Sequence, residues 1–230
     1  MPDVPDDNQI GLGRIRSVDE RDQEFLLPKR IRAADEIRSR TWFSLGVMDQ
    51  GATSQCVAYA GTKYLESGPI VQKSPVVPQV LYNECQRVDE WPGEAYDGTS
   101  VRALFKVLKT RGLVSEYRWA FEFTPVIDHV LYRGPVVMGT SWHREMFTPD
   151  RWGYIAPDGP IDGGHAWLII GAARDRKNPD GSTGAVRMIN SWGPNWGSQN
   201  GRAWITFANL DKLIKDDGEA CTATEIRKAL

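Results

Sequence analysis

Apolar residues in the first half of the chain recur with the 3.6-residue period of an α-helix. In the segment 56–66 this apolar face consists of Val57, Ala60, Gly61, Tyr64 and Leu65. Ser54 stands before the segment as a candidate N-cap, and Gly68-Pro69 follows it as a stop signal. The pattern therefore predicts a helix that begins at or next to Cys56.

Two further helices are expected before the middle of the chain. The segment 101–110 follows Thr99 and Ser100, either of which can serve as its N-cap, and it ends near Gly112. Its predicted buried face consists of Val101, Leu104, Phe105 and Leu108. The segment 78–90 has a less regular period and is also predicted to be helical.

The second half of the chain has the pattern of β-strands. Short apolar or alternating runs lie close to glycine or proline at 135–139, 166–170, 185–189 and 201–207. Residues 174–184 are rich in charge, Asn, Pro and Gly, which predicts an exposed hairpin. Helices followed by strands predict an α+β fold with two lobes.

The first 26 residues lack apolar periodicity and are rich in Asp and Arg. We expect residues 1–26 to form a polar, loosely docked extension, with the ordered domain spanning 27–230. They contain no apolar stretch of signal-peptide length, and the longest apolar run, 166–170, is too short to cross a bilayer. The expectation is a soluble, cytoplasmic protein with no membrane partner.

Composition narrows the classes of partner and cofactor. Of 230 residues 41% are hydrophobic, enough to bury a core, and a net charge of −2 provides no basic field for nucleic acid. Three cysteines cannot all pair within one chain, so no disulfide framework is expected and a reducing compartment is the simpler interpretation. Without a Cys-x-x-Cys pair, and with three histidines, neither a metal site nor a cofactor is predicted.

Cys56 is the candidate nucleophile among the three cysteines. A helix N-terminus stabilises a thiolate, because its unpaired backbone N–H groups and the helix dipole favour negative charge. Cys85 lies within a predicted helix, and Cys221 lies in a predicted C-terminal strand. Both fit better as small buried hydrophobic residues.

His165 is the candidate general base. It follows Gly163-Gly164, which permit close approach of another chain, and it opens the predicted strand 166–170, whose sheet would hold it rigidly. His129 lies in an apolar, helix-like run and is expected to be structural. His143 lies in a loop-like stretch, and its role is left open.

Two amides complete the candidate site. Asn190 ends an apolar strand, so its oxygen can accept a hydrogen bond from one imidazole nitrogen and fix the ring, with Trp192 covering that bond. Gln50 lies six residues before Cys56, where its amide N–H can form an oxyanion hole with the backbone N–H of Cys56. Standing alone, the run from Asn190 to Gly197 would be an ordinary turn with core tryptophans.

These motifs together resemble the papain family of cysteine peptidases. The resemblance is carried by Gln50-Gly51-x-x-x-x-Cys56, Gly164-His165-Ala166, Asn190-Ser191-Trp192-Gly193, Trp196-Gly197 and Asn200-Gly201. It covers about residues 45–225 and implies a helical lobe near 45–125, a β-barrel-like lobe near 126–225 and an active-site cleft between them.

Two departures from the family pattern matter. Thr53 replaces the cysteine that usually precedes the nucleophile by three positions, so that family disulfide cannot form. Relatives commonly carry a long helical inhibitory pro-region, whereas about 26 residues precede Leu27-Pro28. The chain is therefore similar to bacterial or phage-type members without that region, and its regulation is left open.

The resemblance also implies where a peptide would bind, between the backbone at 98–99 and the strand that opens at His165. The expected substrate-binding residues, besides Trp192, are Gly98, Thr99, Gly164, Gly139 and Ala166. Gly139 and Ala166 would line the pocket for the side chain preceding the cleaved residue, with Trp142 and Met138 as candidate walls. Small residues leave a pocket open, so a bulky apolar or aromatic side chain is expected there.

The sequence thus predicts a cysteine-type peptidase that hydrolyses a peptide or protein substrate through an acyl-thioester. Two alternatives stay open, since fold does not fix substrate. One is an amide- or acyl-transferring relative acting on isopeptide or cell-wall links, and the other is a catalytically silent peptide-binding module. The joint presence of Cys56, His165, Asn190 and Gln50 argues against the silent module.

Overall fold

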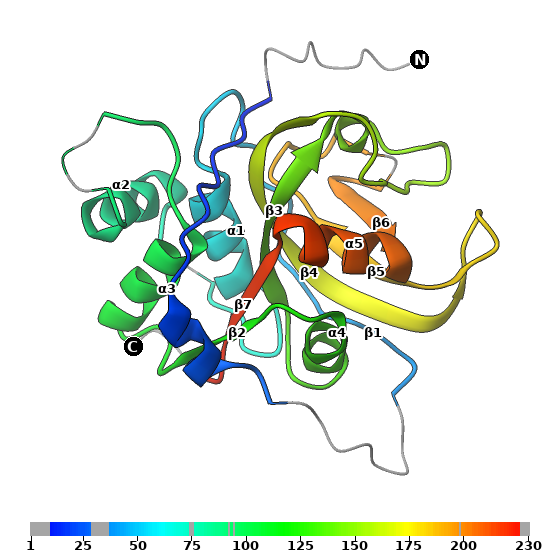
Figure 1. Cartoon of the computed structure of the whole chain (residues 1–230), viewed down its shortest axis with the longest axis horizontal. Coiled ribbons are helices and arrows are strands. Elements are labelled where there is room, and N and C mark those ends of the chain that lie inside the picture. Colours follow the sequence, from blue (N-terminus) through cyan, green and yellow to red (C-terminus); the bar gives the residue numbers. More distant parts are fainter. Residues whose placement is uncertain are drawn as a thin grey trace.

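A computed structural model describes residues 10–28, 37–73, 76–91, 93, 95–197 and 199–225. Helices α1 to α3 gather on one side, and most strands lie on the other (Figure 1). The elements are η2 (Glu20–Phe25), β1 (Ser39–Thr41), α1 (Cys56–Leu65), α2 (Pro78–Val88), α3 (Val101–Thr110), β2 (Tyr117–Ala120), α4 (Phe123–Tyr132), β3 (Val136–His143), η3 (Arg144–Phe147), β4 (Ile161–Lys177), β5 (Thr183–Ile189), β6 (Arg202–Thr206), α5 (Phe207–Asp217) and β7 (Glu219–Ala223). This arrangement confirms the predicted α+β class.

The helix starts follow local capping chemistry where a cap exists. Ser100 caps α3 by accepting a hydrogen bond at Oγ from the backbone N–H of Ala103 at 3.0 Å. Helix α1 begins at Cys56 itself, and its N-cap is Gln55, so the predicted cap at Ser54 is wrong. No side chain caps α1, and nine of its ten residues are buried.

One antiparallel sheet carries the second lobe, in the order β2-β7-β3-β4-β5-β6, and β1 pairs with β4. The long strand β4 lies at its centre, and its register with β3 places Ala166 opposite Gly139 and His165 opposite Thr140. The sheet is an open path rather than a closed barrel. The predicted hairpin at 174–184 forms where β4 turns into β5.

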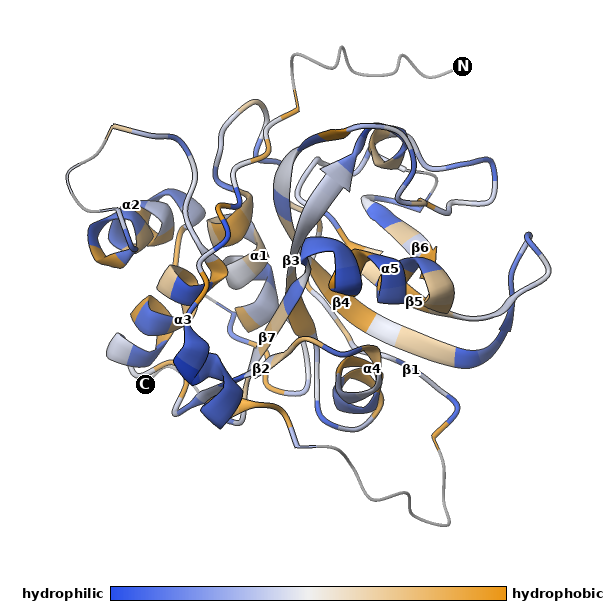
Figure 2. Ribbon diagram, in the orientation of Figure 1, coloured by the Kyte–Doolittle hydropathy of each residue, from blue (hydrophilic) through white to orange (hydrophobic). Residues whose placement is uncertain are grey.

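Two hydrophobic cores lie on opposite faces of this sheet. Val137 and Leu168 belong to the core shared with α1 and α3. Met138 and Trp167, each directly next to one of these residues in its strand, belong to the core covered by α4 and α5. Successive side chains of a strand point to opposite faces, so one pair of strands serves both cores. In Figure 2 the middle of β4 has the colours of apolar residues, which agrees with its contacts to both cores.

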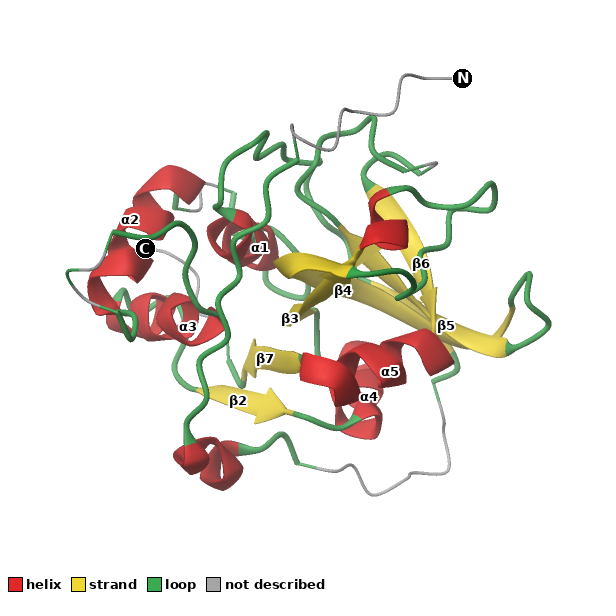
Figure 3. Ribbon diagram, turned by 45° about the horizontal axis from the view of Figure 1, so that its top comes forward, coloured by secondary structure: helices red, strands yellow, loops and turns green. Residues whose placement is uncertain are grey.

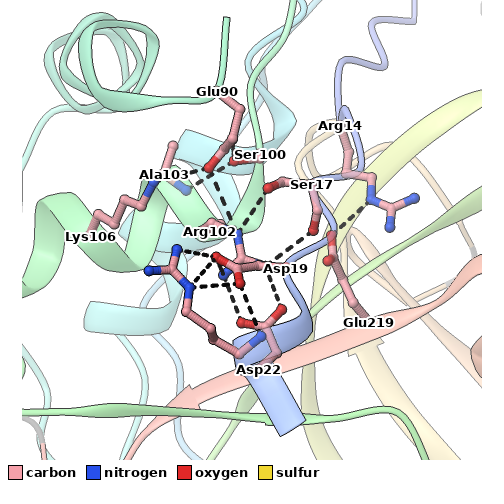
Figure 4. A network of polar contacts seen from close by, with 11 residues as sticks. Arg14, Ser17, Asp19, Asp22, Glu90, Ser100, Arg102, Ala103, Lys106 and Glu219 are labelled. Carbon is pink, nitrogen blue, oxygen red and sulfur yellow. Dashed lines mark hydrogen bonds and ion pairs between the residues drawn. The ribbon is translucent and has the colours of Figure 1, made fainter. Parts of the chain in front are cut away.

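Residues 10–28 pack against both lobes instead of forming a loosely docked arm. In Figures 1 and 3 this segment runs along the boundary between the helices and the sheet. Figure 4 shows its anchor on α3, where Arg102 contacts Ser17 and Asp22. Leu27 closes the segment with a backbone hydrogen bond to Trp119 O at 2.7 Å. The part of the predicted extension that precedes residue 10 lies outside the described residues.

Among the described residues, no helix combines the length and the apolar character that crossing a membrane requires.

Candidate active site

Cys56 is held at the first turn of α1, where this helix meets β4. Its side chain is fully buried, and Sγ accepts a hydrogen bond from the backbone N–H of Ala166 at 3.3 Å. Ala166 directly follows His165 in β4. The sulfur atom of the candidate nucleophile therefore lies beside the strand position that carries the candidate base.

Asn190 orients the imidazole ring of His165. Nε2 of His165 lies 2.8 Å from Oδ1 of Asn190, and both side chains are buried. The same oxygen accepts the backbone N–H of Ser191 at 2.8 Å, which assigns the amide with its oxygen towards the ring. Nε2 must then carry the hydrogen, so in the neutral ring Nδ1 is unprotonated and can accept a proton.

Nδ1 of His165 makes no hydrogen bond within the described residues, although it is buried. Unsatisfied buried polar atoms are few in native proteins, and catalytic use is one of their explanations. Because Asn190 occupies Nε2, Nδ1 is the nitrogen left to take a proton from Cys56.

Two tryptophans enclose this pair of side chains. The ring of Trp192 stacks on His165 with centroids 4.6 Å apart, and Trp142 meets His165 edge-on at 4.7 Å. Water excluded from the bond between His165 and Asn190 cannot compete with it, so the bond is stronger than it would be in solvent. Trp192 therefore lies directly against the imidazole of His165.

The side-chain amide of Gln50 is held in a fixed orientation by hydrogen bonds at both ends. Ser191 Oγ donates to Gln50 Oε1 at 2.6 Å, so the NH2 group points the other way. Nε2 donates to the backbone oxygens of Thr53 at 2.7 Å and Gly11 at 3.0 Å. The carbonyl of Gly11 also accepts the indole N–H of Trp192 at 3.2 Å. A carbonyl of the chain itself therefore occupies the donor that was predicted to bind the substrate oxyanion.

Residues 10–17, here called the N-terminal strap, run across the predicted substrate site. Thr99 donates its backbone N–H to Gly13 O and accepts the N–H of Ile15, both at 2.9 Å. On the other side, Gly164 O accepts the backbone N–H groups of Gly13 and Arg14, both at 3.0 Å. The strap thus uses the backbone groups of Thr99 and Gly164, whereas the backbone groups of Gly98 bond Tyr82 and Gln86 instead.

Two glycines of the strap permit this close approach. A Cβ at Gly11 would lie 2.0 Å from Thr53 O, and a Cβ at Gly13 would lie 2.3 Å from Ser54 O. Gly13 also has φ of +130°, a conformation that side chains disfavour. The segment that faces the strap also needs a glycine, because a Cβ at Gly98 would lie 2.3 Å from Gly13 O. The strap fits only because these positions have no side chain.

The ionisation of Cys56 and His165 reflects their burial beneath the strap. Burial raises the pKa of the Cys56 thiol to about 12, against the opposing effect of the backbone N–H of Ala166. Burial lowers the pKa of His165 to about 4, although its hydrogen bond to Asn190 acts in the other direction. In the closed arrangement both groups are neutral, because a thiolate and an imidazolium each lose solvation there. A highly reactive Cys56, as the sequence suggested, is therefore a property expected only of an open site.

The other cysteines and histidines lie outside this cluster. His129 hydrogen-bonds Thr222 Oγ1 at 3.2 Å, and His143 bonds the carbonyl of Gly159 at 3.0 Å. Cys85 is buried in α2 and Cys221 in β7, as small core residues. All three cysteines of the chain are free thiols.

The free thiols lead to a prediction about reductant. Dithiothreitol is expected to leave the melting temperature unchanged, because no cross-link exists to be reduced. Loss of a disulfide typically costs about 2–5 kcal/mol, and each kcal/mol shifts the melting temperature of a chain of this size by about 2–4 °C. Paired thermal scans with and without dithiothreitol check this, and a fall of several degrees would contradict the free-thiol assignment.

Comparisons with known proteins give a match in structure and none in sequence. No family model matches this chain, and no curated protein matches it. Xylellain, a cysteine protease from Xylella fastidiosa, aligns with TM-score 0.68 at 17% identity, covering 94% of this chain and 97% of that one. Digestive procathepsin L2 from Tenebrio molitor aligns with TM-score 0.61 at 18% identity, covering 94% and 78%. Bromelain from Ananas comosus, in complex with the E64 inhibitor, aligns with TM-score 0.58 at 15% identity, covering 81% and 98%. At these identities the likeness shows a shared papain-like fold.

Proposed function

We propose that this chain is a cysteine peptidase acting on a peptide or protein substrate, with Cys56 as nucleophile, His165 as base and Asn190 as the residue that orients the base. The observation that carries the proposal is the buried 2.8 Å contact between His165 Nε2 and Asn190 Oδ1, which leaves Nδ1 to accept the thiol proton. The papain-like fold supports it, since xylellain, which shares that fold, is a cysteine protease.

The proposed reaction proceeds through an acyl-thioester. His165 Nδ1 takes the proton of Cys56 Sγ, and the thiolate attacks the substrate carbonyl carbon to form a C–S bond. Gln50 Nε2 donates to the oxyanion of the tetrahedral intermediate. The C–N bond then breaks, and the imidazolium of His165 returns its proton to the departing amine. Water, deprotonated by the same imidazole, then attacks the thioester carbon, the C–S bond breaks to release the acid, and Cys56 Sγ regains its proton from the imidazolium.

The proposal requires the N-terminal strap to leave the site before a substrate binds. Gly11 O occupies the Gln50 donor, and the strap backbone occupies Thr99 and Gly164. Gly11 O lies at the Gln50 donor, and Arg14, whose side chain lies beside Gly139, comes after Gly11 in the chain. In a substrate, the residue whose side chain enters the pocket at Gly139 would instead come before the residue whose carbonyl is attacked. The strap therefore runs opposite to the direction expected of a substrate.

The test uses the full chain carrying Gly11→Val and Gly13→Val, because side chains at these positions would displace the strap. This displaced chain is incubated with unfolded casein, with and without an added amine acceptor, and the products are identified by mass spectrometry. We expect hydrolysed peptides in both reactions and none from the displaced chain carrying Cys56→Ala. Products that form only with the amine would favour the transferring relative, and none in either reaction would favour a silent module.

Gln50→Ala in the displaced chain should lower turnover by about 10²–10³, the usual effect of losing one oxyanion donor. Gln50 also accepts from Ser191 and donates to Thr53, so we expect lower stability too, by about 1–3 kcal/mol for groups left unpaired. The melting temperature of the variant should therefore fall as well. Steady-state kinetics on the folded Gln50→Ala variant check its role as oxyanion donor. A turnover within about twofold of that of the displaced chain would contradict this role.

A further inference from the structure

Arg14 of the N-terminal strap is a buried cation in a site of its own. Its side chain is 1% exposed. Arginine is rarely buried to this extent unless its charge is paired. The strap enters the boundary between the lobes here, so the surroundings of Arg14 show what this part of the site can bind.

Two carboxylates hold the guanidinium. Nε of Arg14 donates to Glu219 Oε1 at 3.1 Å, and Nη1 donates to Asp217 Oδ2 at 2.8 Å. Nη2 donates to the backbone oxygen of Asp217 at 3.1 Å. All three nitrogens of the fork are thus used, and Figure 4 shows Arg14 and Glu219 facing each other. A lysine ammonium, a single point of charge, cannot reproduce these three contacts.

Small residues leave the room for this side chain. A Cβ at Gly139 would lie 2.8 Å from Glu219 Oε1 and 2.9 Å from Arg14 Nε. A Cβ at Gly164 would lie 3.3 Å from Cδ of Arg14. Val101 contributes apolar contact next to Gly139. Gly139 is the residue predicted to floor the pocket for the side chain preceding the cleaved residue.

The carboxylates depend on the strap for their positive partners. Glu219 is 2% exposed, and Asp217 is 32% exposed. Among the described residues, the cations in ion-pair contact with either of them are Arg14 and Arg16, both in the strap. Once the strap leaves, Glu219 and Asp217 lose these ion-pair partners, and a substrate cation can take their place.

We infer that Glu219 and Asp217 make this pocket selective for arginine, so that the peptidase cleaves after a residue that is itself preceded by arginine. The inference rests on the proposed function and names its substrate class. The side-chain contacts of Arg14 involve the guanidinium tip, so a substrate arginine can make them even though its backbone runs in the opposite direction. Arg14 is then the internal occupant of the substrate pocket.

The two apolar wall residues expected from the sequence do not lie next to Glu219 and Arg14. Met138 and Trp142 were candidate walls, but they belong to the core on the opposite face of the sheet. Gly139 faces the other way because it alternates with them along β3. The residue that completes the pocket, Glu219, is 80 positions further along the chain and reaches Gly139 because β7 pairs with β3 there.

The test compares cleavage by the displaced chain of three peptides that differ only in arginine, lysine or leucine before the cleaved residue. We expect kcat/KM to be at least about tenfold higher for arginine than for leucine, with lysine between them. Glu219→Gln should lower the arginine value by about 10- to 100-fold and leave the leucine value within about threefold. Asp216→Asn is the matched control, since Asp216 is exposed and pairs with Lys212. Equal cleavage of arginine and leucine peptides, or an equal loss of both on Glu219→Gln, would overturn the inference.

A binding measurement keeps the inference testable without catalysis. Calorimetry is carried out with the displaced chain carrying Cys56→Ala and a synthetic peptide of residues 10–17. The same peptide with Arg14→Leu should bind at least about tenfold more weakly, the loss expected for one charged hydrogen-bonded contact. Equal affinities would overturn the arginine pocket, whereas tight binding of the arginine peptide with no cleavage of any substrate would contradict only the peptidase proposal.

Discussion

Displacing the N-terminal strap should raise peptidase activity by at least about tenfold. In the Gly11→Val/Gly13→Val chain, the new side chains would overlap the backbone oxygens of Thr53 and Ser54, at 2.0 and 2.3 Å from Cβ. Backbone atoms cannot move aside as a flexible side chain can, and overpacking of this kind costs about 1–3 kcal/mol per site. Each 1.4 kcal/mol is a factor of about ten in the equilibrium between closed and open forms.

The same displacement should expose Cys56 to alkylation. In the closed form burial holds the pKa of Cys56 near 12, so little thiolate exists at neutral pH. With the strap released, solvent reaches Cys56 and His165, and both pKa values should move back towards their ordinary ranges. Rates of iodoacetamide labelling, mapped by mass spectrometry, should rise at Cys56 and stay low at Cys85 and Cys221.

Gly46→Val is the matched control for the strap variants. A Cβ at Gly46 would meet no atom within 4 Å, so this substitution adds a side chain without displacing anything. Its activity and Cys56 labelling should equal those of the unmodified chain. If the strap variants also behave like the unmodified chain, the strap does not restrict access to Cys56.

Removing either Cys56 or His165 should reduce peptide hydrolysis by about 10⁴-fold or more, as loss of a nucleophile or its base does in other peptidases. Cys56→Ala removes the atom that forms the thioester. His165→Ala leaves the thiol without a base and should also slow alkylation of Cys56 in the displaced chain. The two losses should not add in a double variant, because the residues act as one unit.

The Asn190→Ala variant tests whether Asn190 acts by orienting His165 or only by supporting the structure. It should lower turnover while the thiol and imidazole remain, because Nε2 of His165 would lose its 2.8 Å contact. His129→Ala offers a comparison, since His129 is partly buried but lies outside the site, against Thr222. A similar loss of turnover from both variants at equal stability would contradict the assigned role of Asn190.

Local signals in the sequence predicted much of the helical lobe. The bounds of α3 match the prediction at 101–110, because a serine cap and a clean apolar face mark both the start and the register. Helix α2 ends at Val88, shortly before the predicted end. Helix α5 was missed, although Leu210, Leu213 and Ile214 have helical spacing, because an alternating strand pattern runs directly into it.

Short strands and the strap could not be predicted in the same way. Strands β1 and β2 have three and four residues, too few to show a period. The strap is held by backbone hydrogen bonds and by glycines, which leave no apolar pattern. A Gly-x-Gly spacing at 11–13 beside an arginine is the one signal present, and by itself it indicates only a turn.

The sequence identified candidate site residues by their types and local motifs. How their side chains lie relative to one another depends on the fold. Cys56, His165 and Asn190 come from three distant segments, and the register of β3, β4 and β5 brings the last two together. Ser191 was not singled out, although it fixes the amide orientation of both Asn190 and Gln50. Glu219 was missed because a single acidic residue at the start of a buried strand does not reveal which pocket it will face.

The central claim is that Cys56 forms a covalent acyl-enzyme with a peptide substrate. The most direct measurement is rapid acid quenching of the displaced chain with a peptide ester, followed by intact-mass analysis and peptide mapping. The account predicts one adduct of the acyl mass, located on Cys56 and absent from the Cys56→Ala chain. An adduct on Cys85 or Cys221, or ester turnover with no adduct on Cys56, would contradict it.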